Sequence, residues 1–317
     1  MPLDSRPLAV FLMGPTATGK TELACALHGR FPLDVVSVDS ALVYRGMDVG
    51  TAKPDAAVLA RCPHALIDVR DPAQAYSAAE FRTDAQAAMQ GISQRGRVPL
   101  LVGGTGLYFR ALQQGLSELP AADAATRMQL ALAAEREGWP AMHVRLARLD
   151  PEAARRIDSH DAQRIQRALE VIELTGRRLS DLHRRPAGSR LPWRVLKLGL
   201  VPTDRGLLHA RIAHRFDAML AAGLVAETAR LLAQTGVHAD LPAMRAVGYR
   251  QAAAFLRGES TAVGFRERGI QATRQLAKRQ MTWLRGDPEL RHFEPWHAAL
   301  QDRVSAAIAL FLGPDRA

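Results

Sequence analysis

Two residue types are scarce in this chain of 317 residues: cysteine occurs twice, and lysine supplies four of the 42 basic side chains. Cys25 and Cys62 are too few for a disulfide framework and fit a reducing compartment. No CxxC pair occurs, and neither does a Cys/His cluster with the spacing of zinc ligands. The sequence therefore predicts no structural metal.

Long apolar runs are also missing. The first apolar stretch, in MPLDSRPLAVFLMGP, is far too short to span a membrane and leads into a glycine-rich turn rather than a cleavage site. We expect a cytoplasmic protein with no membrane partner. Internal repeats, heptads and low-complexity tracts are absent as well, and the length allows one large domain or two ordinary ones.

Acidic residues are outnumbered, with 32 Asp and Glu against 42 Lys and Arg and a net charge of +10. The excess lies after residue 122: the chain up to that point carries 11 basic and 11 acidic side chains, residues 123–200 carry 15 and 10, and residues 201–317 carry 16 and 11. A GC-rich coding sequence would explain arginine in place of lysine, but not this segregation. The balance favours a polyanionic partner such as nucleic acid or phosphates.

Short apolar runs rich in β-branched residues alternate with helical stretches. Four runs in the first half, at 8–14, 34–40, 64–69 and 98–104, end in turn signals and predict strands. Residues 78–91 place Phe81, Ala85, Ala88 and Met89 at near-helical spacing, which predicts a crossover helix. This alternation indicates an α/β domain built on a parallel sheet.

The pattern changes at about residue 120. Up to residue 188 there is no strand-like run, only charged amphipathic stretches, and a strand signal returns at 193–201 before a long helix pair. We therefore predict a core formed by residues 1–119 and 193–317, and a smaller all-helical inserted domain over residues 120–192.

Residues 14–21, GPTATGKT, match the phosphate-binding pattern GxxxxGK[ST] between a strand and a helix predicted to begin near Thr21. Backbone N–H groups of such a loop enclose phosphate oxygens, Lys20 reaches the outer phosphates and Thr21 can ligate Mg²⁺. The fold class is thus a P-loop-type parallel sheet flanked by helices, with an inserted smaller all-helical domain.

A phosphate loop alone would suggest a kinase or NTPase, which normally carries a magnesium-binding Asp at the end of a core strand. The fourth strand ends instead in a second glycine loop, residues 103–106, that contains Thr105. Asp39 and Asp68 follow other strands, so nucleotide hydrolysis is disfavoured but stays open. The paired aspartates DDxxD of metal-clustering prenyl synthases do not occur.

Five blocks in order, GPTATGKT, DSALVYRGMDVGTAKP, LLVGGTGLYFRAL, DLPAMRAVGYRQ and TRQLAKRQMTWLR, are similar to signatures of the tRNA dimethylallyltransferase family. They span nearly the whole chain. Animal, fungal and plant members often add a zinc finger after this core; none follows here, so the chain resembles the bacterial form.

The resemblance implies transfer of a dimethylallyl group from dimethylallyl diphosphate to the exocyclic N6 of adenosine-37, beside the anticodon of tRNA, with Mg²⁺. The phosphate loop would hold the diphosphate through Gly14, Pro15, Thr16, Ala17, Thr18, Gly19, Lys20 and Thr21, with Thr21 as the metal ligand. Asp39 would be the general base; from the residues alone it could equally cap a helix or bind Mg²⁺. Thr105 would contact the leaving group.

A third catalytic residue is expected on the helix that contains RGLLHARIAHRFDAML. Its apolar stripe is formed by Leu208, Ile212, Phe216 and Met219. This leaves Arg211 and Arg215 one turn apart on an adjacent face. Such a pair can point at phosphate, or be ordinary solvated arginines. By resemblance Arg215 contacts the diphosphate.

The tRNA would lie across basic surfaces, since a stacked adenine must be flipped out to reach a buried diphosphate. On the predicted helix at 273–285, Arg274, Lys278 and Arg285 share the side opposite the apolar residues. The resemblance assigns tRNA contacts to Asp39, Ser40, Ala41, Leu42, Thr105, Arg127, Gln163, Arg164, Ile165, Gln166, Arg167, Arg245, Gly248, Tyr249 and Arg250. From the residues alone, a solvated surface is the favoured interpretation of the Gln/Arg helix at 163–167.

Three other functions remain to be tested: a P-loop kinase or NTPase, an adenylate isopentenyltransferase that makes free cytokinin, and an RNA-binding module with a vestigial nucleotide pocket. A basic helical insertion has little use in the second, and intact Lys20, Thr21, Asp39 and Thr105 argue against the third. We expect a monomer whose partners are dimethylallyl diphosphate and the anticodon stem-loop of tRNA.

Overall fold

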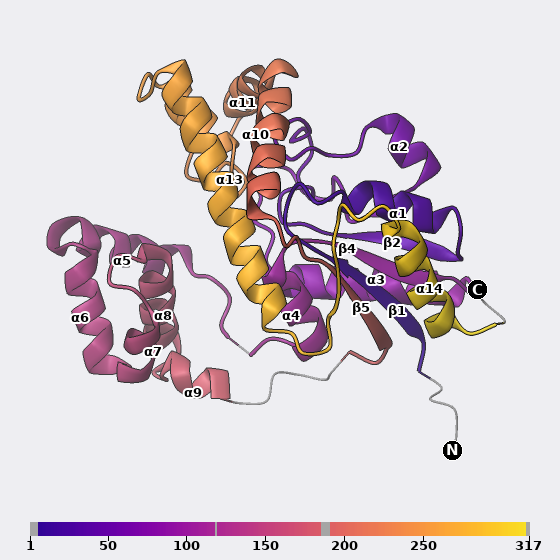
Figure 1. The fold of residues 1–317 in the computed structure, drawn as a ribbon. Helices are drawn as coiled ribbons and strands as arrows, with labels where there is room; N and C mark the ends of the chain where they lie inside the picture. Colours follow the sequence, from indigo (N-terminus) through magenta and orange to yellow (C-terminus); the bar gives the residue numbers. More distant parts are fainter. Residues whose placement is uncertain (1–5, 118, 185–190, 315–317) are drawn as a thin grey trace. The chain divides into compact units, whose positions relative to one another are not determined.

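The computed structural model describes residues 6–117, 119–184 and 191–314 (Figure 1). It divides into two compact units, one formed by residues 1–112 and 192–317 and the other by residues 113–191. The first break therefore comes earlier than the predicted residue 120, near the end of α4 (Gly106–Gln114). In the described part of the chain, no helix is both long and apolar enough to cross a membrane.

The larger unit is built on one parallel sheet of six strands in the order β3-β2-β4-β1-β5-β6. The strands are β1 (Leu8–Met13), β2 (Leu33–Val38), β3 (His64–Ala65), β4 (Val98–Gly103), β5 (Arg194–Leu200) and β6 (Arg291–Phe293). This confirms the predicted α/β class. The third predicted strand is shorter than expected because the chain turns at Leu66 and Asp68, whose φ angles are 66° and 56°. The edge strand β6 was not predicted.

Helices cover both faces of the sheet. Those of the larger unit are α1 (Lys20–His28), α2 (Ala56–Arg61), α3 (Ala78–Gln94), α4, α10 (Arg205–Ala221), α11 (Leu224–Leu232), α12 (Tyr249–Leu256), α13 (Ala262–Arg285) and α14 (Leu300–Leu312). The predicted crossover helix is confirmed as α3. It begins with a capping box, in which the Ser77 hydroxyl accepts the Glu80 N–H and the Glu80 carboxylate accepts the Ser77 N–H.

Alternate side chains of each strand pack against opposite layers. On one face, Val10, Leu12 and Leu100 pack with residues of α1 and α14, such as Leu27 and Ile308, in one buried cluster. On the other, aromatic rings meet: Phe11 lies 5.2 Å from Phe109 of α4, which stacks on Trp283 of α13 at 5.8 Å. These layers fix α1, α4 and α13 against the strands that precede the glycine loops.

The smaller unit is helical throughout its described residues. It contains α5 (Ala124–Glu137), α6 (Trp139–Leu149), α7 (Pro151–Arg156), α8 (Ala162–Thr175) and α9 (Leu179–Arg184). Leu130, Met142, Leu146, Ile165 and Leu169 form its core. Because this core is separate from that of the sheet, the predicted all-helical insertion is an independently packed unit.

Strand order decides where the site lies. In a parallel sheet the carboxyl ends of all strands meet at one edge, and β2, β4 and β1 are neighbours. The loops that follow these three strands carry Asp39, Thr105 and the phosphate loop, which the sequence separates widely.

Candidate active site

The phosphate loop connects β1 to α1 through two residues in the left-handed region, Ala17 with φ 66° and Gly19 with φ 79°. The Thr18 hydroxyl donates to the Pro15 carbonyl oxygen at 2.8 Å, which closes the loop on itself. The Lys20 ammonium donates to the same carbonyl at 2.7 Å. This arrangement presents the first backbone N–H groups of α1 and a lysine to one concavity, as phosphate binding requires.

Asp39 lies directly after β2, where its Oδ1 accepts the backbone N–H of Ala41 at 2.8 Å and that of Leu42 at 3.4 Å. The neighbouring Ser40 N–H donates to the Thr105 hydroxyl oxygen at 3.1 Å. The turn after β2 and the glycine loop after β4 are therefore tied together. Both of the bonds to Asp39 go to Oδ1, and no hydrogen bond to Oδ2 is found among the described residues, so Oδ2 remains available to a substrate.

The close approach of the two loops depends on glycine. A Cβ at Gly103 would lie 2.0 Å from the Val38 carbonyl oxygen, which no side chain can accommodate. Beside it, Gln280 of α13 joins the two glycine loops: its Oε1 accepts the Thr16 N–H at 3.0 Å, and its Nε2 donates to the Gly104 carbonyl at 3.1 Å. One amide thus sets the spacing between the phosphate loop and the loop that carries Thr105.

Two cations share the interior of this region. Burial, reinforced by the positive charge of Arg215, lowers the pKa of Lys20 to about 7, and Asp39 opposes that shift. Burial likewise lowers the pKa of Arg215, opposed by Asp39 and Glu22. Arg215 donates to the Thr51 carbonyl at 3.3 Å, yet its buried Nε has no hydrogen-bond partner among the described residues. A bound polyanion would stabilise the charged forms of Lys20 and Arg215 and would give the Arg215 Nε a hydrogen-bond acceptor.

Arg211 lies one turn before Arg215 on α10 and donates from Nε to the Ala17 carbonyl of the phosphate loop at 3.2 Å, while its guanidinium lies 5.6 Å from the Trp296 ring centroid. Both arginines of the predicted pair therefore approach the phosphate loop. Leu208, Ile212 and Phe216 of the predicted stripe are buried, whereas Met219 is only partly buried and lines the cavity.

These groups line one cavity of about 1320 Å³ in the larger unit. Its wall combines the phosphate loop with Asp39, Arg211, Arg215 and Gln280, and adds apolar side chains such as Leu42, Phe216 and Met219. The volume exceeds that of typical small-molecule pockets, which hold about 300–1,000 Å³. It is large enough for two reactants.

Asp68, the other acid that the sequence places after a strand, is engaged elsewhere. Its carboxylate pairs with Lys53 at 2.5 Å, and the same ammonium contacts Asp48 at 2.6 Å and donates to the Tyr44 carbonyl. The Lys53 side chain is only 4% exposed. Asp68 therefore stabilises the loop between β2 and α2, and it does not line the cavity.

A second loop on the cavity wall, residues 48–50, is held by Glu227 of α11. The Glu227 carboxylate accepts N–H bonds from Asp48, Val49 and Gly50 at 2.9–3.1 Å, and a bond from the Tyr249 hydroxyl at 2.6 Å. Glu227 is buried, and Tyr249 is completely so. The side chain of Tyr249 thus supports this loop, and an RNA contact through it would require rearrangement.

The other predicted tRNA residues near α12 differ in exposure. Arg245 and Arg250 are exposed, whereas Gly248, at φ 95°, is buried and donates its N–H to Gln251 at the start of α12. Arg274, Lys278 and Arg285 of α13 are exposed as predicted. The larger unit therefore offers five arginine and lysine side chains to solvent among the residues assigned to tRNA or to the basic side of α13.

In the smaller unit, Glu170 organises two of the predicted tRNA residues. Its carboxylate is fully buried and accepts bonds from Arg127 at 2.9 Å and from Arg167 at 2.7 Å, and these contacts outweigh burial and lower its pKa. Arg167 also donates to the Pro120 carbonyl at 2.7 Å. Arg127 therefore joins α5 to α8, and Arg167 joins α8 to the segment that precedes α5.

The remaining residues of the Gln/Arg helix divide between core and surface. Ile165 is fully buried in the helical core, so its side chain cannot reach RNA in this conformation. Gln166 donates to the Arg127 carbonyl at 2.9 Å. Gln163 is exposed, and the Arg164 side chain is 71% exposed beside Asp161. Arg164 is the basic residue of this helix that is best placed for a phosphate.

The profile of the IPP transferase family matches residues 42–287, which is more than half of the chain. The chain belongs to this family. It is 58% identical to the tRNA dimethylallyltransferase of Thiobacillus denitrificans over 97% of this chain and 98% of that protein. It is 62% identical to the enzyme of the same name from Alkalilimnicola ehrlichii, with 88% of each chain covered.

Solved structures agree with this membership. The full-length tRNA isopentenylpyrophosphate transferase of Bacillus halodurans is 33% identical, with a TM-score of 0.69 over 96% of this chain and 97% of that one. A eukaryotic dimethylallyltransferase acting on tRNA shares the fold with a TM-score of 0.77, 24% identity, and coverage of 96% and 79%. Family membership confirms that this IPP transferase is a transferase of the tRNA-modifying class.

Three features of this IPP transferase were not singled out from sequence. Gln280 lies inside a quoted block, but only its pairing with Thr16 and Gly104 reveals that it joins two loops. No sequence pattern distinguishes Glu227 from other glutamates on helices; its role depends on the N–H groups of residues 48–50, which its carboxylate accepts only in the folded protein. Spacing along the chain also gave no sign that Cys25, Cys62 and His64 lie close together in the fold.

Proposed function

We propose that this IPP transferase moves a dimethylallyl group from dimethylallyl diphosphate to N6 of adenosine-37 in tRNA, giving N6-(dimethylallyl)adenosine and diphosphate. The observation that carries this assignment is that the partly buried basic side chains of Lys20 and Arg215 line one cavity together with the Asp39 carboxylate. The cations suit an anionic leaving group, and the carboxylate suits removal of a proton from the attacking amine.

The diphosphate is assigned to the phosphate loop. Backbone N–H groups at the start of α1, Lys20 and Arg215 would bind its oxygens and take up the charge that develops as the C–O bond breaks. The Arg215 Nε that lacks a partner gives this anion a specific hydrogen-bond donor. Arg211 holds the phosphate loop through the Ala17 carbonyl and adds positive charge.

The transfer step needs one base. The amine nitrogen of the adenine forms a bond to the prenyl carbon as the C–O bond to diphosphate breaks, and its proton passes to Oδ2 of Asp39. Thr105, which is bonded to the turn that follows Asp39, is the proposed hydrogen-bond donor to the departing oxygen. The apolar wall near Leu42, Phe216 and Met219 would hold the prenyl chain away from water.

Magnesium fits this donor set. The Thr21 hydroxyl lines the cavity in the first turn of α1, and hard oxygen ligands of this kind, with substrate phosphates and water, are what Mg²⁺ prefers. Bound there, the ion would neutralise diphosphate charge. Thr21 is accordingly its proposed protein ligand.

Transfer can be measured directly. Purified protein with Mg²⁺ and labelled dimethylallyl diphosphate would be offered unmodified tRNA with adenosine-37, the same tRNA with guanosine-37, AMP, and ATP as a hydrolysable nucleotide. We expect label on the adenosine-37 tRNA alone. Label on AMP would instead identify an adenylate isopentenyltransferase, and ATP hydrolysis without prenyl transfer would identify an NTPase; either result would overturn the proposal.

A further inference from the structure

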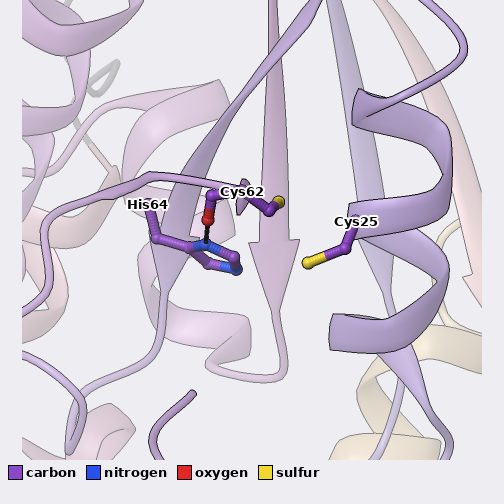
Figure 2. Close-up of side chains that lie close together, drawn as sticks. All are labelled: Cys25, Cys62 and His64. Atoms are coloured by element: carbon purple, nitrogen blue, oxygen red, sulfur yellow. Dashed lines mark hydrogen bonds between the residues drawn. The ribbon is translucent and has the colours of Figure 1, made fainter. Parts of the chain in front are cut away.

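A cluster of two thiols and an imidazole lies on the wall of the large cavity, apart from the residues assigned to transfer (Figure 2). Cys25 comes from α1, Cys62 follows α2, and His64 begins β3. One potential ligand atom from each lies within 4.8 Å of the others. In Figure 2 the Cys25 sulfur points toward the His64 ring and Cys62.

The imidazole is already oriented for ligation. The Nδ1 of His64 lies 2.6 Å from the Cys62 carbonyl oxygen, so Nδ1 carries the proton and donates it to that carbonyl. The neutral ring then has its lone pair on Nε2, which is buried and has no hydrogen-bond partner among the described residues. A carbonyl bond on one ring nitrogen that leaves the other free is the arrangement found in metal-ligating histidines.

The thiols complete a soft donor set. Both cysteines are free; Cys62 is buried, and Cys25 is partly buried. Zinc bonds of about 2.3 Å to sulfur and 2.0 Å to nitrogen place tetrahedral ligands roughly 3.3–3.8 Å apart. A contraction of about 1 Å, within the reach of side-chain rotation, brings the three atoms to that spacing.

We propose that Cys25, Cys62 and His64 bind one Zn²⁺ ion through two sulfurs and Nε2. Binding releases two thiol protons to solvent, and the fourth ligand is a water that enters from the cavity. The ion ties α1, the helix that follows the phosphate loop, to the segment between α2 and β3. Two sulfurs and an imidazole select Zn²⁺ over Mg²⁺, which prefers oxygen.

The test uses full-length protein, reduced and stripped with a chelator, without either substrate. Co²⁺ is titrated in while the absorption of thiolate-to-cobalt charge transfer and of tetrahedral Co²⁺ is recorded, and Zn²⁺ is then added as competitor. Because the chain has only two cysteines, any thiolate band reports this cluster. We expect one Co²⁺ per chain, displaced by Zn²⁺, and protection of both thiols from a thiol reagent.

Ligand variants identify the site. Cys25→Ser, Cys62→Ser and His64→Gln should each weaken Zn²⁺ binding by about 100-fold or more, since loss of a ligand exceeds the 10- to 100-fold effect of losing a supporting bond. His28→Gln is the matched control: His28 also lines the cavity, but it is not part of the group whose ligand atoms lie within 4.8 Å of one another. If Cys62→Ser fails to fold, Cys25→Ser and His64→Gln still test Zn²⁺ binding, because Cys25 and His64 are only partly buried.

Two results would overturn the proposal. One is the absence of a thiolate-to-cobalt band in the wild type. If mild oxidation of that protein also joined Cys25 to Cys62, the two cysteines would be a redox pair instead of metal ligands. The other is a band that persists in His64→Gln and disappears in His28→Gln. Neither result bears on prenyl transfer, which uses other residues of the cavity.

Discussion

Asp39 is oriented by its own turn, because two backbone N–H groups bond to Oδ1 and leave Oδ2 for the substrate. Asp39→Asn keeps the acceptor oxygen and removes the base. We expect kcat to fall by about 10² to 10⁴ while tRNA affinity stays within a few-fold. Single-turnover prenyl transfer and a filter-binding assay measure the two quantities.

Asp204→Asn is the matched control for that change. Asp204 caps α10 through the Leu207 N–H at 3.0 Å and does not line the cavity. Its substitution should leave the transfer rate unchanged. Wild-type turnover by Asp39→Asn would remove Asp39 from the mechanism.

Lys20 makes diphosphate binding depend on pH. Its pKa of about 7 lies below the unfolded value of 10.5, so between these limits the unfolded chain binds one more proton, and this residue makes the ligand-free protein more stable as the pH rises. A bound anion restores the charged form. Affinity for dimethylallyl diphosphate should therefore fall as the pH rises above about 7.

Calorimetry at pH 8 in buffers of different ionisation enthalpy measures this linkage. We expect net proton uptake when dimethylallyl diphosphate binds, because the lowered pKa of Lys20 leaves this group mostly unprotonated at that pH in the ligand-free protein. Lys20→Met should bind weakly and take up none. Equal uptake by the variant and the wild type would assign the proton to another group.

At the scale of elements, α13 acts on the site through one amide. Gln280→Ala would leave the partly buried Thr16 N–H and Gly104 carbonyl without their partner, at a cost of about 1 kcal/mol for each group. We expect the Kd for dimethylallyl diphosphate to rise about tenfold and the thermal midpoint to fall. Isothermal titration and thermal unfolding report the two effects.

The control for this element is Gln275→Ala. Gln275 is exposed on the same helix and outside the large cavity, so neither quantity should change. If Gln280→Ala also left both quantities unchanged, the two loops would be held by the sheet alone.

Element prediction succeeded where one local pattern was enough. The run at 98–104 and the helical spacing at 78–91 correspond to β4 and α3, because each buries a simple apolar face. β6 escaped prediction because only Phe293 of its three residues is buried, so pairing with β5 creates the strand. The run at 64–69 was shortened by two left-handed residues that composition does not reveal.

At the scale of the whole molecule, the basic excess after residue 122 predicts RNA binding, and the structure separates the arginines that are available from those that are not. Arg164→Ala should weaken tRNA binding and reduce the slope of log K against log salt by about 1. Binding measured between 50 and 200 mM salt, the range over which phosphate contacts are most sensitive, checks this. An unchanged slope would place the tRNA elsewhere.

Arg167→Ala tests a different property. It removes one of two cations from the buried Glu170 carboxylate, so we expect the helical unit to lose about 1–3 kcal/mol of stability in urea unfolding. Arg145→Ala, which breaks a partly exposed pair with Glu173, is the control and should cost about 0–1 kcal/mol. Equal losses would mean that Glu170 does not organise this unit.

The sequence by itself determined the fold class, the phosphate loop, the helical insertion and the candidate base, because each depends on residues that are close along the chain. Tertiary structure alone decided which distant groups meet. Strand order β2-β4-β1 brings Asp39, Thr105 and Lys20 to one edge, and α13 supplies Gln280 from the far end of the chain. Arg167 and Tyr249 bond to protein groups inside the fold and so support the structure. The packing of α1 also places Cys25 close to Cys62 and His64. Spacing along the chain cannot encode such contacts, because they arise only when separate elements pack against a common sheet.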